Sequence, residues 1–141
     1  MKRSASAEWH GDLKKGKGKI STDSGVLKDA QYSFGTRFEN GAGTNPEELI
    51  AAAHAGCFSM ALSNILGKAE LTASRIRTKA IVSLEQVDGN FSITAVHLDV
   101  SAKVPGADKA GFDKAANDAK SGCPVSRVLN AKITMSATLE K

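Results

Sequence analysis

Alternation of apolar and polar residues is the main hydrophobic pattern in this chain. Successive side chains of a β-strand point to opposite faces, so alternation predicts strands. We predict strands over residues 3–9, 17–21, 32–36, 76–86, 91–104 and 133–139. The turn sequence Asp88-Gly89-Asn90 is typical of a hairpin between the fourth and fifth of them. A shift of the apolar phase between Ile93 and Val96 predicts a β-bulge in the return strand.

Residues 46–66 have a different pattern, which predicts a long helix. Thr44 or Asn45 can cap its start, and Pro46 suits the first helical position. The helix is apolar on nearly all sides and rich in alanine. A helix without a polar face is normally buried, so we expect other elements to enclose it.

Two further helices are predicted over residues 108–121 and 124–130. The inward face of the first would consist of Phe112, Ala115, Ala116 and Ala119. The elements follow one another as strands, helix, strands, helices and a last strand. This order favours an α+β fold over alternating βαβ units.

The length and cysteine content limit the class of protein. A chain of 141 residues favours a single domain over residues 1–141, and two cysteines are too few for a disulfide scaffold. The N-terminus runs straight into polar sequence without the apolar core of a signal peptide. His54 and Ser59 interrupt the apolar helix, which favours a core helix over a membrane span. We therefore expect a cytoplasmic protein with reduced thiols and no membrane partner.

The net charge of +4 arises entirely in the first twenty residues. Residues 1–20 contain six basic and two acidic side chains, whereas residues 21–141 contain thirteen of each. The lysine-rich segment 14–19 is compatible with phosphate contact, but a solvated hairpin is the commoner explanation. No aromatic residues alternate with these lysines, so we expect no nucleic-acid partner.

Cys57 lies inside the long apolar helix and is the first candidate for chemistry. Burial alone raises the pKa of a thiol and leaves it inert, so a reactive Cys57 needs a nearby cation. Glu47, His54 and Cys57 fall within one stripe roughly 80° wide on an ideal helix. Arg37, at the end of the predicted third strand, is the candidate cation. Its guanidinium stays charged and can pair with Glu47 through two parallel hydrogen bonds.

Cys123 is the only other cysteine. It precedes Pro124, which suits a first helical turn, so Cys123 lies at or next to a helix start. A helix N-terminus stabilises a thiolate, which makes Cys123 a candidate resolving thiol. The alternative for each cysteine is a small buried apolar residue without chemistry. An arginine at the surface and a hydrogen-bonded core histidine are the corresponding alternatives for Arg37 and His54.

These motifs together resemble the OsmC/Ohr family, which comprises osmotically inducible protein C and organic hydroperoxide resistance protein. The resemblance covers essentially the whole chain and is closest to the OsmC branch. The segments that carry it are Thr36-Arg37-Phe38-Glu39, Gly43-Thr44-Asn45-Pro46-Glu47-Glu48-Leu49, Ala53-His54-Ala55-Gly56-Cys57-Phe58-Ser59-Met60-Ala61-Leu62 and Gly122-Cys123-Pro124-Val125-Ser126.

The resemblance implies a cysteine-based peroxidase of the oxidative and osmotic stress response. It would reduce alkyl or fatty-acid hydroperoxides, and hydrogen peroxide more weakly. Cys57 matches the peroxidatic cysteine and Cys123 the resolving cysteine, with which it forms an intramolecular disulfide. Arg37 matches the residue that activates the thiolate, and Glu47 the residue that orients Arg37. The reductant would be a dithiol such as a lipoylated protein, and no cofactor or metal is implied.

The resemblance also implies an intertwined α+β homodimer, with antiparallel sheets around the apolar helix at about 46–66. Other functions stay open on the residues alone. One is a non-catalytic thiol sensor or stress-binding protein. Another is a zinc module built from His54, Cys57, Cys123 and a carboxylate, although no CxxC or HxxxH pair supports it. A Cys/His hydrolase is a third, and no orienting residue or oxyanion loop supports it.

Overall fold

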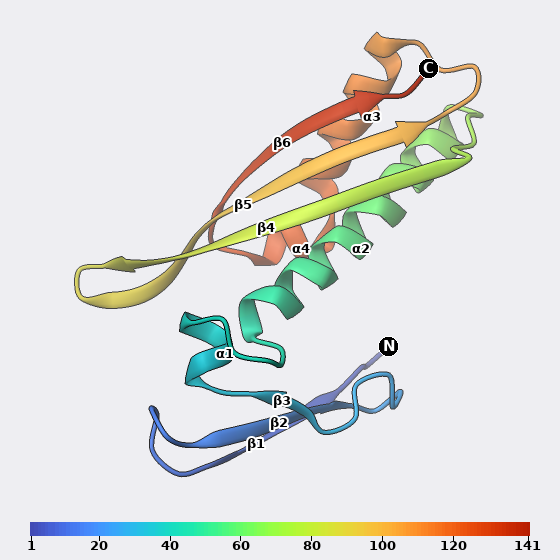
Figure 1. Ribbon diagram of the computed structural model, residues 1–141. Helices are drawn as coiled ribbons and strands as arrows, with labels where there is room; N and C mark the ends of the chain where they lie inside the picture. The colour runs from blue at the N-terminus through green and yellow to red at the C-terminus, as the bar shows by residue number, and fades with distance from the viewer. The chain divides into compact units, whose positions relative to one another are not determined.

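The computed structural model describes residues 1–141 and divides them into two units, Met1–Leu49 and Ile50–Lys141 (Figure 1). Each unit is described by itself. The single domain expected from the length stays a prediction.

The first unit contains a small antiparallel sheet. Its strands β1 (Ala5–His10), β2 (Lys17–Thr22) and β3 (Ala30–Tyr32) lie in the order β1-β2-β3. The rings of Trp9 and Tyr32 lie 5.4 Å apart, on either side of β2. A Cβ on Gly18 would lie 2.3 Å from the Tyr32 ring and 2.8 Å from Trp9. Glycine at this position therefore allows both rings to cover the middle strand.

The predicted third strand is wrong beyond Tyr32. Residues Phe34–Phe38 form a short helix, α1, so Arg37 lies on a helix and not at a strand end. Ser33 explains the difference. Its hydroxyl accepts a hydrogen bond from the Thr36 N–H, and the Thr36 hydroxyl in turn accepts one from the Ser33 N–H. This reciprocal cap starts a helix where side-chain alternation alone indicates a strand.

The second unit contains a three-stranded sheet in the order β4-β5-β6. Strands β4 (Arg75–Val87) and β5 (Asn90–Lys103) form the predicted hairpin, with positive φ angles at Asp88 and Gly89. Ser83 pairs with Ala95, but Leu84 pairs with Ile93, which leaves one extra residue on β5. The predicted β-bulge is therefore confirmed.

The last strand, β6 (Lys132–Leu139), pairs with β5 in parallel. The expectation of antiparallel sheets holds for β1-β2-β3 and for the β4-β5 hairpin, but the second sheet as a whole is mixed. The parallel pairing has a simple cause. The chain leaves β5 and passes through two helices, so it can return to the sheet in the same direction, which a tight hairpin forbids.

Three helices accompany this sheet: α2 (Pro46–Lys68), α3 (Lys109–Gly122) and α4 (Pro124–Val128). Figure 1 shows α2, which begins in the first unit and continues through the second, and α3 on the same side of the sheet. The four residues predicted to face inward on α3 are all buried. They pack with a set of side chains from α2 and β5: Phe58, Leu62, Leu66, Val96, Leu98, Val100 and Ala102.

The buried residues of α2 follow a helical spacing and occupy one face. His54, Phe58 and Leu62 have no exposed surface, and Leu66 is 1% exposed. The opposite face contains Met60, which is 76% exposed. By length and composition α2 would also be able to cross a membrane, a test that core helices pass as well. Within the second unit, other elements cover only one side of the helix that the sequence predicts to be enclosed.

Candidate functional site

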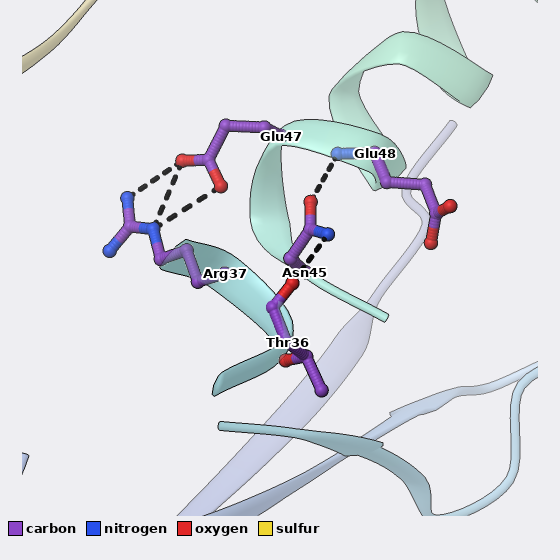
Figure 2. A network of polar contacts seen from close by, with 5 residues as sticks. All are labelled: Thr36, Arg37, Asn45, Glu47 and Glu48. Atoms are coloured by element: carbon purple, nitrogen blue, oxygen red, sulfur yellow. Dashed lines mark hydrogen bonds and ion pairs between the residues drawn. The ribbon is translucent and has the colours of Figure 1, made fainter. Parts of the chain in front are cut away.

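Arg37 and Glu47 form a close ion pair within the first unit (Figure 2). The Arg37 Nη2 atom donates to Glu47 Oε1 at 2.7 Å, and Arg37 Nε lies 3.2 Å from both carboxylate oxygens. The Arg37 side chain is 35% exposed and that of Glu47 is 11% exposed. The structure therefore brings together the two charged residues that the sequence pairs, and the carboxylate fixes the plane of the guanidinium.

The start of α2 holds this pair in position. The Asn45 side chain accepts a hydrogen bond from the Glu48 N–H at 2.7 Å, which caps the helix and selects Asn45 over Thr44 as its N-cap. The same amide donates to the Thr36 carbonyl at 3.0 Å (Figure 2). Asn45 thus connects the first turn of α2, which carries Glu47, to the residue that precedes Arg37.

A cavity of about 300 Å³ lies beside Arg37 in the first unit. Its lining is mainly aromatic and apolar and consists of Trp9, Leu13, Tyr32, Ser33, Phe34, Arg37, Phe38 and Pro46. The rings of Phe34 and Phe38 lie 4.8 Å apart, and the guanidinium carbon of Arg37 lies 5.3 Å from the centre of the Phe38 ring. The cavity therefore combines one fixed cation with walls that suit an apolar ligand.

The two cysteines lie together in the second unit. The Sγ atoms of Cys57 and Cys123 are 3.0 Å apart, and both are free thiols. Cys57 lies on α2 and is half-buried, whereas Cys123 is fully buried between the end of α3 and the start of α4. A disulfide needs its sulfur atoms about 2.05 Å apart. The pair is close enough to form one after a small movement.

The surroundings of Cys57 within this unit do not activate it. Burial raises the pKa of the Cys57 thiol, and its hydrogen bond with Cys123 raises it further. A hydrogen bond from the Val125 backbone N–H acts in the opposite direction but is outweighed. A reactive Cys57 therefore requires a cation in addition to the groups of its own unit.

His54 lies one helical turn before Cys57 and is completely buried. Its Nε2 atom lies 2.7 Å from the hydroxyl oxygen of Ser126 on α4, and Nδ1 has no hydrogen-bond partner. Burial lowers the pKa of the His54 ring, which keeps it neutral. The structure gathers no group of three or more His, Cys, Asp or Glu side chains, so the zinc alternative finds no ligand set here.

Cys57, Cys123, Arg37 and Glu47 are recognisable from the sequence, but the partners of His54 and Cys57 on α4 are not. Ser126 and Val125 both lie in the segment that follows Cys123. The one sequence signal for the bond between His54 and Ser126 is their spacing from the two cysteines. Ser126 follows Cys123 by three residues, and His54 precedes Cys57 by three. The disulfide that the family resemblance implies between Cys57 and Cys123 would bring these two segments together, but the hydrogen bonds of Ser126 and Val125 were not predicted.

Comparison with known proteins identifies the family. The family model described as OsmC-like protein matches residues 39–138. The chain is 55% identical over 134 residues to "Peroxiredoxin OsmC" of Escherichia coli, covering 95% of this chain and 94% of that protein. It is 32% identical over 100 residues to an "Organic hydroperoxide resistance protein" of Xanthomonas axonopodis, covering 70% of this chain and 68% of the relative. The chain belongs to the OsmC family.

Solved structures show the same fold. OhrB of Bacillus subtilis, an organic hydroperoxide resistance protein, aligns with a TM-score of 0.71 at 24% identity, over 96% of this chain and 98% of its own. An OsmC-like protein from Vibrio cholerae aligns with a TM-score of 0.78 at 17% identity, over 98% and 99% of the two chains. At these identities the likeness concerns the fold.

Proposed function

We propose that this protein is a thiol-dependent peroxidase that reduces organic hydroperoxides in the oxidative and osmotic stress response. The observation that supports it most directly is the 3.0 Å separation of the Cys57 and Cys123 sulfur atoms. A half-buried and a buried thiol at this distance are placed to form a disulfide within one chain. The names of the relatives in E. coli and Xanthomonas point to the same chemistry.

In the proposed reaction the Cys57 thiolate attacks the distal oxygen of the hydroperoxide. The O–O bond breaks, the alkoxide leaves and takes up a proton as the alcohol, and Cys57 becomes a sulfenic acid. The Cys123 sulfur then attacks the Cys57 sulfur. A disulfide forms, the thiol proton joins the departing hydroxide, and water is released. A dithiol from outside, such as a lipoylated protein, reduces the disulfide and completes the cycle.

Arg37 is proposed to stabilise the Cys57 thiolate and Glu47 to orient Arg37. The raised pKa of Cys57 is the reason a cation is needed, because burial without one would leave the thiol protonated. The hydrogen bonds that Arg37 Nε and Nη2 donate to the Glu47 carboxylate support a fixed rather than a mobile guanidinium. Arginine also keeps its charge at every relevant pH.

The cavity beside Arg37 is proposed to take the organic part of the substrate. Its aromatic and apolar lining favours an alkyl or fatty-acid chain, which gains free energy by leaving water. Hydrogen peroxide has no such chain and gains nothing from these walls. The preference for organic hydroperoxides over hydrogen peroxide follows from this difference in binding. The protein is proposed to act in the cytoplasm, where thiols stay reduced.

A homodimer is proposed as the working assembly. The exposed side of α2 supports it, because Met60 and the small residues around it form an apolar face that this chain does not cover. A single OsmC-like domain per chain, residues 1–141, is part of the same proposal.

Two cysteine variants test the proposed roles. Cys57→Ser is expected to abolish consumption of cumene hydroperoxide with a dithiol reductant. Cys123→Ser is expected to permit one oxidation and then stop. Intact mass after one equivalent of hydroperoxide separates the states: the wild type loses two hydrogens, and Cys123→Ser gains one oxygen or more. Normal turnover by Cys57→Ser would contradict the assignment.

The same assay distinguishes an enzyme from a sensor. A non-catalytic thiol sensor would also form the disulfide with one equivalent of hydroperoxide. It would not consume many equivalents when dithiol is supplied. Sustained consumption by the wild type is therefore the expected result, and a single stoichiometric oxidation would favour the sensor.

A further inference from the structure

Two side-chain contacts with the same spacing join α2 to the segment around α4. The His54 ring lies 2.7 Å from the Ser126 hydroxyl, and the Cys57 sulfur lies 3.0 Å from that of Cys123. His54 precedes Cys57 by three residues, and Ser126 follows Cys123 by three. Each pair of neighbours is separated by about one helical turn. The hydrogen bond therefore lies one turn away from the thiol contact and connects the same two elements.

Besides these two contacts, α4 is held by the hydrogen bond from the Val125 N–H to Cys57 and by the partly buried side chains of Val125 and Leu129. It is five residues long, and none of its residues is fully buried. Val125 packs against the core only partly, and Val128 is 77% exposed. The Cys123 side chain makes no capping hydrogen bond at its start. A short helix with little buried surface moves easily unless a specific contact holds it.

His54 is suited to act as a fixed anchor. It is fully buried on α2, in line with the core residues Phe58 and Leu62, so its ring position is set by packing. Nε2 is the ring atom that bonds to Ser126, and which of the two atoms donates depends on the tautomer of the ring. Nδ1 has no hydrogen-bond partner, so the bond to Ser126 is the one that the ring makes.

We propose that the His54–Ser126 hydrogen bond is a positioning contact that holds Cys123 in reach of Cys57 for disulfide formation. This inference rests on the proposed function and concerns its second step. The sulfur of Cys123 attacks the sulfenic acid sulfur of Cys57, the S–O bond breaks, and the Cys123 proton leaves with the hydroxide as water. His54 touches neither sulfur in this step and acts through Ser126.

The position of α4 decides between two fates of the sulfenic acid. When Cys123 stays in reach, condensation protects Cys57. When α4 moves away, the sulfenic acid survives long enough to react with a second hydroperoxide and becomes a sulfinic acid, which a dithiol does not reduce. The contact therefore controls how much hydroperoxide the protein tolerates before it is inactivated.

Ser126→Ala is the direct test, with rapid quenching and intact mass analysis after mixing with cumene hydroperoxide. Formation of the sulfenic acid is expected at the wild-type rate. Its conversion to the disulfide is expected to slow by about tenfold, the factor that corresponds to about 1.4 kcal/mol. The fraction that gains two oxygens at excess hydroperoxide rises accordingly.

Conservative and control variants separate positioning from a general loss of stability. Ser126→Thr keeps the hydroxyl, and His54→Gln keeps a hydrogen-bonding amide near the Nε2 position. Both variants are therefore expected to retain much of the wild-type condensation rate that Ser126→Ala loses. Ser59→Ala is the matched control. It removes a serine hydroxyl on α2 that contacts Thr78 on β4 at 2.8 Å, and it leaves α4 untouched. Ser59→Ala is expected to condense at the wild-type rate.

The outcomes distinguish this inference from the proposed function. A wild type that forms neither sulfenic acid nor disulfide would overturn both. A wild type that forms the disulfide while Ser126→Ala condenses equally fast would overturn the positioning role alone. Slow condensation in Ser59→Ala as well would also overturn it, because a loss of fold stability would then explain the effect.

Discussion

At the scale of single residues, burial and the proposed reactivity have opposite effects on Cys57. Burial raises the pKa of its thiol, and the neighbouring Cys123 raises it further. At neutral pH such a thiol is almost entirely protonated and a poor nucleophile. The proposed peroxidase therefore depends on a charge supplied from outside the immediate surroundings of the sulfur.

Arg37→Ala is expected to give Cys57 a higher pKa than in the active wild type and to slow peroxide reduction by about two orders of magnitude or more. The physical reason is the loss of the one fixed cation proposed to act on the thiolate. Arg37→Lys restores the charge but not the planar fork, so it should rescue only partly. Glu47→Ala leaves the guanidinium mobile and should slow the reaction less than Arg37→Ala does. The rate of iodoacetamide alkylation at Cys57 against pH, in a Cys123→Ser background, measures the effect.

The chain offers a matched control for this experiment. Arg75 also pairs with a carboxylate, that of Glu140, and its side chain is 48% exposed. Arg75→Ala removes an equal charge from another ion pair and should leave the alkylation profile of Cys57 unchanged. If Arg37→Ala left the profile unchanged as well, Arg37 would be excluded as the activator.

At the scale of elements, the long patterns were predictable and the short ones were not. The β4-β5 hairpin and its bulge follow from local alternation and from one turn sequence, so both were predicted correctly. Alternation over residues 32–36 predicts a strand where α1 begins at Phe34, because so short a segment satisfies either period. The deciding signal was the Ser33–Thr36 capping pair, which takes precedence over alternation in so short a segment.

Contacts between distant segments lie beyond what the pattern of one sequence contains. The parallel pairing of β6 with β5 and the bond between His54 and Ser126 join residues that are far apart in the chain. Arg37–Glu47 was different, because ten residues and a loop with glycines separate them and their charges are opposite. Thus the candidate site was predictable where its partners are local or chemically complementary.

The start of α2 allows a prediction about this element. Asn45→Ala removes the cap of the helix and the bond to the Thr36 carbonyl, so the free energy of unfolding should fall by about 1 kcal/mol or somewhat more. Urea denaturation followed by circular dichroism measures the shift. Asn64→Ala, at an exposed position of the same helix, is the control and should change the midpoint little. Equal midpoints for the two variants would contradict the capping role.

At the scale of the whole molecule, α2 has an apolar side without a cover. Its buried face from His54 to Leu66 packs in the core of the second unit. Its other side exposes Ala52, Ala53, Gly56 and Met60. Small residues there allow close approach of a neighbouring surface, and no side chain meets a Cβ built on Gly56. A second copy of the chain is the proposed cover.

The dimer is tested at Met60, which is 76% exposed in the single chain. Met60→Lys would place a charge in the proposed interface, where burial without a partner costs several kcal/mol, so the dissociation constant should rise by about tenfold or more. Sedimentation velocity at low micromolar concentration should give a dimer for the wild type and a growing monomer fraction for the variant. Val26→Lys is the control, because Val26 is 84% exposed and its replacement adds the same charge to a residue outside α2. A monomeric wild type, or an equal loss of dimer in both variants, would contradict an interface on this helix. The exposed side of α2 would then need a different partner.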